Sequence, residues 1–233
     1  MTIIALKNKL AKLFACLFIF TVLFYANFWV STSFVNAMPS SKFTVVLDAG
    51  HGGIDTGCSG ANGTYESEIA LKIVQKLGAH LSALGQNVVY TRTNMDGLYG
   101  TFASGFKLRD LNKRKQIINQ CNADLVVSIH LNSFVDSSAC GAQVFFKIGS
   151  EQSEQLANNV QELFAKNLFK ARTTAQKGDF FILNCSDAVG ILCECGFLSN
   201  PEEEALLKTD AYLQKISYNI AVGILTYFDL VKF

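Results

Sequence analysis

The chain has 233 residues, half of them hydrophobic, and a formal net charge of +1. This near-neutral charge argues against nucleic-acid binding, which usually leaves a strongly basic footprint. With only 2 prolines, no low-complexity run and no internal repeat, the sequence also excludes a disordered chain and a solenoid.

The N-terminus carries a targeting signal. Lys7, Lys9 and Lys12 precede an apolar run over residues 13–30 that contains no charged side chain. A basic flank before such a run is typical of an export segment whose lysines stay in the cytoplasm. We therefore expect a membrane-associated N-terminus and an exported remainder of the chain.

Two forms of this export segment are compatible with the sequence. The apolar run is just long enough to span a bilayer, which favours an uncleaved anchor. Val-Asn-Ala at residues 35–37 instead offers small residues suited to signal cleavage. We expect residues 1–38 to be a signal sequence or membrane anchor, and residues 39–233 to form one domain outside the cytoplasmic membrane.

Strand-like and helix-like segments alternate along the exported part. Strands are predicted where short apolar runs end at turn residues, over residues 43–50, 87–92, 123–130, 141–149 and 188–196. Helices are predicted where apolar residues recur every three or four positions, over residues 66–85, 107–121, 151–169 and, as one or two helices, 201–231. This alternation predicts an α/β fold with a mainly parallel, twisted sheet and helices on both faces.

Ionisable residues follow the predicted strands where they end. His51 comes just after the first strand, His130 closes the third, and Glu194 lies near the end of the last. Glu66 starts the first helix, which faces the same edge. Because ligands bind beyond the carboxyl ends of the strands in such sheets, we expect these four side chains on one rim.

Two imidazoles and one carboxylate form the protein ligands of many hydrolytic zinc sites. A second carboxylate is then free to transfer protons. His80 does not belong to this set, because it shares a polar helix face with Lys72 and Lys76 and is expected at the surface.

Four motifs, in this order, resemble the zinc-dependent N-acetylmuramoyl-L-alanine amidases of the Amidase_3 type: VVLDAGHGG, YESEIAL, RKQIINQCNADLVVSIHLNS and ILCECGFLSNPEEEALL. The resemblance implies that residues 39–233 are a zinc amidase catalytic domain. It places the Zn²⁺ ligands on His51, Glu66 and His130, and the catalytic glutamate on Glu194.

The resemblance also implies the reaction, which is hydrolysis of the amide between N-acetylmuramic acid and L-alanine in peptidoglycan. Glu194 would take a proton from the attacking water and pass it to the leaving amine. Asp48 and Asn132 lie beside ligands and are candidates to orient the histidines. Ala49 and Cys58 depart from the family pattern, where proline and a small residue are usual, and leave the ligand set intact.

Other features suggest a subtype and partners. The short anchored domain, DGLYGTFASGF and SIHLNS are most similar to germination-specific members. That likeness implies spore-cortex modification, with muramic-lactam formation, or cell-wall remodelling. Residues 94–106 have no periodicity and are predicted to form a mobile loop for substrate or a partner. Some relatives require an activator, so an accessory protein is a further candidate partner.

Several alternatives stay open at this stage. A zinc peptidase acting within the stem peptide would use similar ligands, and a non-catalytic wall-binding domain could retain the same fold. Arg114 and Asn119 are expected on a solvated helix face. Most cysteines are expected to be small buried side chains, with Cys193 and Cys195 on one face of their strand and Glu194 on the other.

Overall fold

The computed structural model describes residues 18, 21 and 42–230. The predicted signal or anchor at residues 1–38 therefore lies outside the described residues, apart from those two positions. Every helix in the described part is too short or too polar to cross a membrane.

The described residues form one six-stranded sheet with the order β2-β1-β3-β6-β4-β5. Its strands are β1 Thr44–Ala49, β2 Asn87–Tyr90, β3 Leu125–Asn132, β4 Gln143–Lys147, β5 Gln176–Gly178 and β6 Val189–Phe197. Neighbouring strands are parallel except β4 and β6, which run antiparallel. The predicted α/β fold with a mainly parallel sheet is confirmed, while β5 was missed because three residues are too few for a periodic signal.

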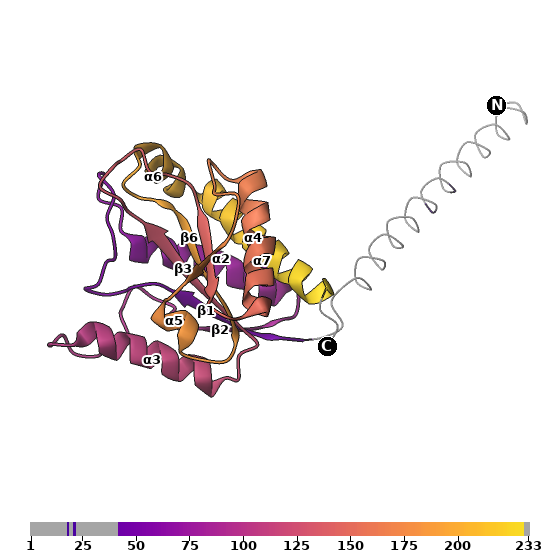
Figure 1. Cartoon of the computed structure of the whole chain (residues 1–233), viewed down its shortest axis with the longest axis horizontal. Helices are drawn as coiled ribbons and strands as arrows, with labels where there is room; N and C mark the ends of the chain where they lie inside the picture. Colours follow the sequence, from indigo (N-terminus) through magenta and orange to yellow (C-terminus); the bar gives the residue numbers. More distant parts are fainter. Residues whose placement is uncertain (1–17, 19–20, 22–41, 231–233) are drawn as a thin grey trace, which may run out of the picture. The chain divides into compact units, whose positions relative to one another are not determined.

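Helices cover both faces of the sheet (Figure 1). One face is covered by α2 Glu66–Ala83, α4 Glu151–Asn167 and α7 Asp210–Leu230. The other carries α3 Phe106–Gln120 and α5 Phe181–Asn184. The short α6, Pro201–Leu207, follows β6 directly. The predicted closing segment is thus two helices, and α5 is a single turn that periodicity could not reveal.

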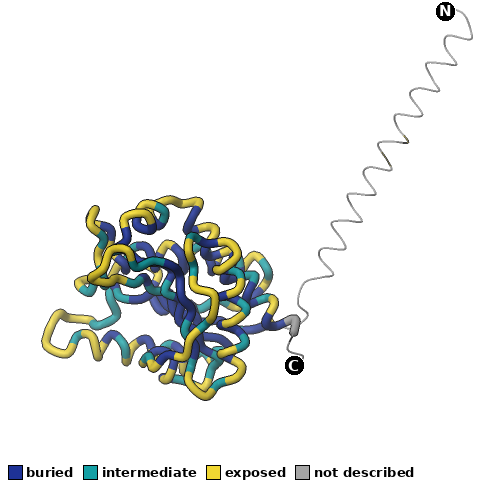
Figure 2. Tube along the Cα trace, turned by 45° about the horizontal axis from the view of Figure 1, so that its top comes forward, coloured by how far each residue is buried: buried dark blue, intermediate teal, exposed yellow. Residues whose placement is uncertain are grey.

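Alternation along β6 divides its side chains between two cores. Ile191, Cys193 and Cys195 pack into the larger core beneath α2, α4 and α7. Leu192 packs into the smaller core beneath α3 and α5. Because side chains of a strand alternate, Glu194 shares the face of Leu192, as predicted. Figure 2 shows the buried residues gathered in the interior of the domain and the exposed residues along its outer turns.

Parallel register aligns polar residues at one edge of the sheet. Asp48 on β1 is paired with Ser128 on β3. His130 on β3 is paired with Glu194 on β6. Partners in register project on the same face. The carboxyl ends of β1, β3 and β6 thus place these side chains in adjacent rows.

The six cysteines of the described part are all free, and three of them are buried. Cys193 and Cys195 are both 0% exposed. Replacing both with alanine should lower the free energy of unfolding by about 2 kcal/mol in total, because two sulfur-sized voids are left in the core. Urea denaturation measures this effect, with the half-buried Cys140→Ala as control. An unchanged unfolding midpoint would contradict the packing role of these thiols.

Candidate active site

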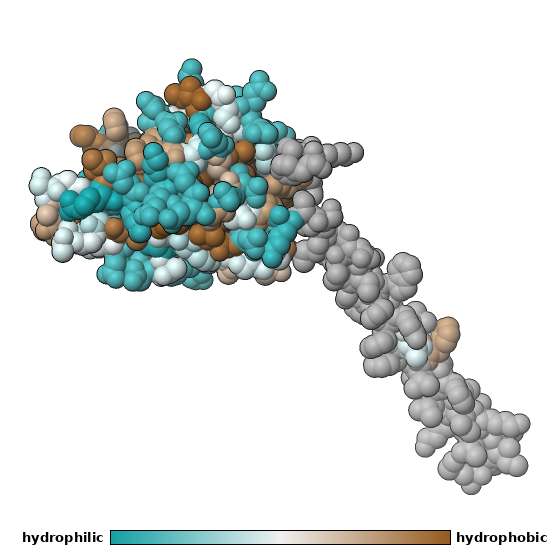
Figure 3. All heavy atoms as spheres, turned by 90° about the horizontal axis from the view of Figure 1, so that it is seen from below, coloured by the Kyte–Doolittle hydropathy of each residue, from teal (hydrophilic) through white to brown (hydrophobic). Residues whose placement is uncertain are grey.

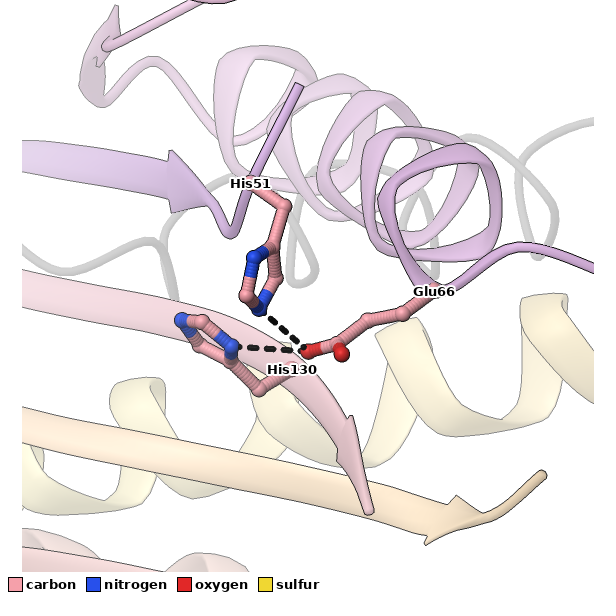
Figure 4. Close-up of side chains that lie close together, drawn as sticks. All are labelled: His51, Glu66 and His130. Atoms are coloured by element: carbon pink, nitrogen blue, oxygen red, sulfur yellow. Dashed lines mark hydrogen bonds and ion pairs between the residues drawn. The ribbon is translucent and has the colours of Figure 1, made fainter. Parts of the chain in front are cut away.

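Three side chains from separate elements converge at the edge of the sheet (Figure 4). Glu66 Oε1 lies 3.1 Å from His51 Nε2 and 2.8 Å from His130 Nδ1. One potential ligand atom from each residue lies within 4.8 Å of the other two. The loop after β1 supplies His51, α2 supplies Glu66 as its first residue, and β3 supplies His130. The structure thus brings together the three residues proposed as ligands.

The arrangement fits a zinc-sized cation. Ligands of tetrahedral Zn²⁺ lie about 2.0–2.1 Å from the ion, which places neighbouring ligand atoms about 3.3 Å apart. The contacts of Glu66 with His51 at 3.1 Å and His130 at 2.8 Å are shorter than that spacing by about 0.2 and 0.5 Å. Two glycines leave the room for the side chains, because a Cβ on Gly50 would overlap the His130 ring and one on Gly57 would overlap Glu66.

Glu66 is held as a carboxylate. Its Oε2 accepts a hydrogen bond from the Cys58 amide at 2.8 Å, and its Oε1 accepts one from the Leu131 amide at 3.1 Å. Burial opposes ionisation, but the hydrogen bonds and charges of His130 and His51 outweigh it and hold the pKa of Glu66 below its ordinary value. An ionised, backbone-oriented carboxylate is suited to binding a cation.

Asp55 is a functional candidate that the sequence analysis missed. Its Oδ2 lies 3.1 Å from His51 Nδ1, the ring nitrogen that faces away from Glu66. Lys107 Nζ lies 3.4 Å from the other oxygen of Asp55. Metal-binding histidines commonly donate their second ring N–H to a carboxylate, which orients the imidazole. The available signal was an acid four residues after a histidine in a glycine-rich loop.

Asp48 acts on the site through another residue. Its carboxylate accepts hydrogen bonds from Thr91 Oγ1 at 2.7 Å and Ser128 Oγ at 2.6 Å, and pairs with Arg114 Nη1 at 2.6 Å. Burial opposes its charge, but Arg114 and Ser128 outweigh burial and lower the pKa of Asp48 to about 2. Its hydrogen bonds thus join β1 to β3, to α3 and to the residue that follows β2, and its link to His51 runs through Arg114.

Two buried guanidinium groups hold the backbone that carries His51. Arg114 donates to the carbonyl oxygens of His51 at 2.5 Å and Ala49 at 2.7 Å. Arg92 donates to those of Ala49 at 2.9 Å and Gly50 at 2.8 Å. His51 has a φ of 59°, a left-handed conformation that is unfavourable for a residue with a side chain. Hydrogen bonds to three successive carbonyls keep it there.

The burial of Arg114 contradicts the sequence-based expectation of a solvated helix face. Arg114 is 2% exposed and also pairs with Asp110 at 2.6 Å. Asp110, Arg114 and Ile118 form the buried stripe of α3 at four-residue intervals. Figure 3 views the domain from below Figure 1, the side on which α3 lies, and this surface is mostly hydrophilic. An arginine can be buried here because two carboxylates compensate for its desolvation.

Glu194 stands beside the three converging residues, in register with His130. Burial raises the pKa of Glu194 to about 7. Its Oε2 is buried without a hydrogen-bond partner among the described residues. Asn132 instead accepts a hydrogen bond from the Ser133 amide at 2.8 Å, which stabilises the end of β3. A role for Asn132 in orienting a histidine stays a prediction.

These residues open into a cleft of about 260 Å³. His51, His130 and Glu194 line it together with side chains of α3 and of the segment that enters α5. That segment contributes Phe180 and Phe181, which add a hydrophobic surface near the polar groups. A cleft with a few converging polar groups and an apolar wall is typical of a site for an organic substrate.

The family assignment follows from a match over most of the chain. Residues 45–226 match the family described as N-acetylmuramoyl-L-alanine amidase. The chain belongs to this family. It is therefore an enzyme that hydrolyses the amide between N-acetylmuramic acid and L-alanine in peptidoglycan, as the four motifs predicted. This result favours the amidase over the peptidase and over a non-catalytic domain.

Individual relatives agree with the assignment. The germination-specific N-acetylmuramoyl-L-alanine amidase of Bacillus subtilis (strain 168) is 33% identical over 197 residues, which cover 82% of each chain. AmiA of Escherichia coli (strain K12) is 30% identical over 233 residues, covering 80% of this chain and 76% of AmiA. The CwlD amidase from Clostridioides difficile, solved in complex with the GerS lipoprotein, is 35% identical with a TM-score of 0.78. That match covers 82% of this chain and all of the solved CwlD chain.

The fit around His130 can be tested at Gly50. A methyl group on Gly50 would overlap the imidazole, so Gly50→Ala should displace the ring and weaken zinc binding by about tenfold or more. Competition with a chromophoric chelator measures the zinc Kd. Gly190→Ala is the matched control, because its new Cβ would come no closer than 3.3 Å to a flexible leucine end, away from the cleft. A Gly50→Ala protein with wild-type zinc affinity would contradict the steric argument.

Proposed function

We propose that this amidase is zinc-dependent, with His51, Glu66 and His130 as the zinc ligands and Glu194 as the proton-transfer group. The observation that carries the proposal is the convergence of two imidazole nitrogens and one Glu66 oxygen at the cleft. The buried carboxylate of Glu194 stands beside them, with one oxygen that has no hydrogen-bond partner among residues 42–230. Three protein ligands leave a fourth position open, as hydrolytic zinc sites require.

The residues of the chain divide the chemistry among them. When bound, zinc would polarise the scissile carbonyl and lower the pKa of a water molecule. Glu194 accepts a proton from the attacking water and returns it to the leaving nitrogen of L-alanine, so it ends the cycle in its starting state. A pKa raised by burial suits a group that must both accept and release a proton near neutral pH.

Several groups keep the histidines in place during the reaction. Asp55 orients the His51 ring, while Arg92 and Arg114 hold the backbone around it. The Leu131 amide fixes the Glu66 oxygen that faces both rings. Preorganised ligands need no rearrangement as charge develops in the transition state, which is the main source of electrostatic catalysis.

We further propose spore-cortex peptidoglycan as the substrate. The germination-specific relative and the CwlD structure support this assignment. The CwlD structure contains the GerS lipoprotein, which also supports an accessory protein partner for this chain. Vegetative cell-wall remodelling is the alternative site of action.

We also propose that residues 1–38 export the chain as a signal sequence or membrane anchor, and that residues 39–233 act outside the cytoplasmic membrane. Lys7, Lys9 and Lys12 before the uncharged run at residues 13–30 support this location. Peptidoglycan lies on that side of the membrane, so the proposed location agrees with the amidase activity.

The roles of the site residues are separable by two variants. Glu194→Gln should abolish turnover while zinc stays bound in a 1:1 ratio, because proton transfer is lost and the ligands remain. His130→Ala should lose zinc and activity together. Elemental analysis and turnover of peptidoglycan measure the two effects, and His80→Ala is the matched histidine control. Loss of zinc from Glu194→Gln would make Glu194 a ligand, and stoichiometric zinc in His130→Ala would remove His130 from the site.

The products of wall digestion identify both bond and substrate. We expect the zinc-loaded enzyme to release full-length stem peptides with a free L-alanine amino group, and to release more from cortex than from vegetative wall. Mass spectrometry of the digests measures this, with Glu194→Gln as the inactive control. Shortened stem peptides would indicate a peptidase, and faster digestion of vegetative wall would contradict the cortex assignment.

A further inference from the structure

Helix α6 carries two neighbouring buried carboxylates that the proposed chemistry does not use. Glu203 and Glu204 are both 0% exposed, whereas the preceding Glu202 is exposed. Buried carboxylates are costly unless hydrogen bonds compensate for lost hydration. Adjacent helix positions point in different directions, so the two side chains reach different parts of the domain. The hydrogen-bond partners of each carboxylate therefore show which segment it stabilises.

Glu204 binds the loop that leads into α2. It accepts hydrogen bonds from the Asn62 amide at 3.1 Å, Asn62 Nδ2 at 2.9 Å and Thr64 Oγ1 at 2.8 Å. Gly60 lets the loop approach this closely, because a Cβ at that position would overlap the Glu204 carboxylate. Thr64, which donates one of these hydrogen bonds, lies only two residues before Glu66.

The other end of the same loop is closed by Glu66 itself. The Glu66 amide donates to the Cys58 carbonyl at 3.0 Å, and the Cys58 amide donates to Glu66 Oε2 at 2.8 Å. Within the loop, the Gly60 amide donates to the Thr64 carbonyl at 2.9 Å. Residues 58–66 are thus a closed loop with Glu66 at its base and Glu204 bound to its outer part.

Glu203 binds the irregular end of β6. Its Oε2 accepts hydrogen bonds from the Phe197 amide at 2.8 Å and the Gly141 amide at 2.9 Å. The register shifts here, since His130 pairs with Glu194 but Asn132 pairs with Phe197, which leaves one extra residue on β6. Such a bulge interrupts the hydrogen bonds of the sheet and re-aims nearby side chains. The Phe197 amide that Glu203 binds is the first one after this bulge.

We propose that Glu203 and Glu204 are positioning residues that couple the two acids of the active site through α6. Glu204 fixes the loop that presents Glu66 to the metal, and Glu203 fixes the bulged strand end that presents Glu194 to the substrate. This inference rests on the proposed roles of Glu66 and Glu194. It predicts that the two neighbouring glutamates have separable effects, one on metal affinity and one on turnover.

The test for Glu204 is zinc affinity in the full-length chain. Glu204→Leu should weaken the zinc Kd by about tenfold or more, because the loop before Glu66 loses its anchor. Thr64→Val removes one of the hydrogen bonds without altering α6 and should weaken zinc binding less, in the same direction. Glu204→Gln keeps an acceptor and should restore most of the affinity. Glu202→Leu is the matched control, since the Glu202 side chain is exposed and its contact with Lys170 at 3.4 Å lies at the surface.

The test for Glu203 is turnover at saturating zinc. Glu203→Leu should lower kcat by about tenfold or more, because Glu194 is displaced by a fraction of an ångström. Its zinc Kd should stay at the wild-type value. Glu203→Asp withdraws the carboxylate by one methylene group and tests the same contact if the leucine variant does not fold. Glu203→Gln should restore turnover, because one amide oxygen can accept both backbone N–H groups.

Circular dichroism and thermal unfolding separate these effects from a general loss of stability. Folded Glu204→Leu and Thr64→Val proteins with wild-type zinc Kd would overturn the inference for Glu204. A folded Glu203→Leu or Glu203→Asp protein with wild-type kcat would overturn it for Glu203. A wild-type chain that binds no zinc would instead overturn the proposed function, so the two failures are distinguishable.

Discussion

The buried ion pair between Asp48 and Arg114 is the interaction on which the site depends most. Its 2.6 Å contact joins the end of β1 to α3, and Ser128 ties the same carboxylate to β3. Arg114 then reaches the carbonyl oxygen of His51, so one guanidinium connects the sheet, a helix and the loop that carries His51. Removing Arg114 would leave the Asp48 carboxylate buried without its ion-pair partner, a change that costs about 3–5 kcal/mol. The same ion pair therefore stabilises the fold and holds His51 in position.

Other charged groups around the cleft are held in the same way. The groups that compensate their charge also fix the positions of the side chains. Glu66 receives two backbone amides in addition to the imidazoles. Asp55 balances Lys107 and orients His51. Glu194 is the exception, because one of its oxygens has no hydrogen-bond partner in the described part of the chain. A buried acid with a free oxygen beside the cleft fits the proton-transfer role that we propose for Glu194.

Much of this could be predicted from the sequence because the relevant signals are local. Near-continuous apolar strands alternating with amphipathic helices are sufficient to predict a parallel α/β sheet. Residues at strand ends then meet at one edge whatever the details of packing, which is why His51, Glu66, His130 and Glu194 could be grouped. Strand alternation likewise separated Glu194 from Cys193 and Cys195. Short elements such as β5 and α5 were missed, since three or four residues carry no period.

Sequence by itself determined the sheet, the order of the motifs and the residue types at its edge, because these follow from hydrophobic period and chain direction. Only the tertiary structure decided which charges are buried together. Arg114 looks like one more cation on a basic helix until Asp48 and Asp110 are placed beside it, and Asp55 becomes an orienting group only when the loop folds back to His51. Glu203 and Glu204 look no different from Glu202 in the sequence, yet two are buried and one is exposed. Burial and pairing depend on contacts between distant segments, and such contacts leave no local pattern.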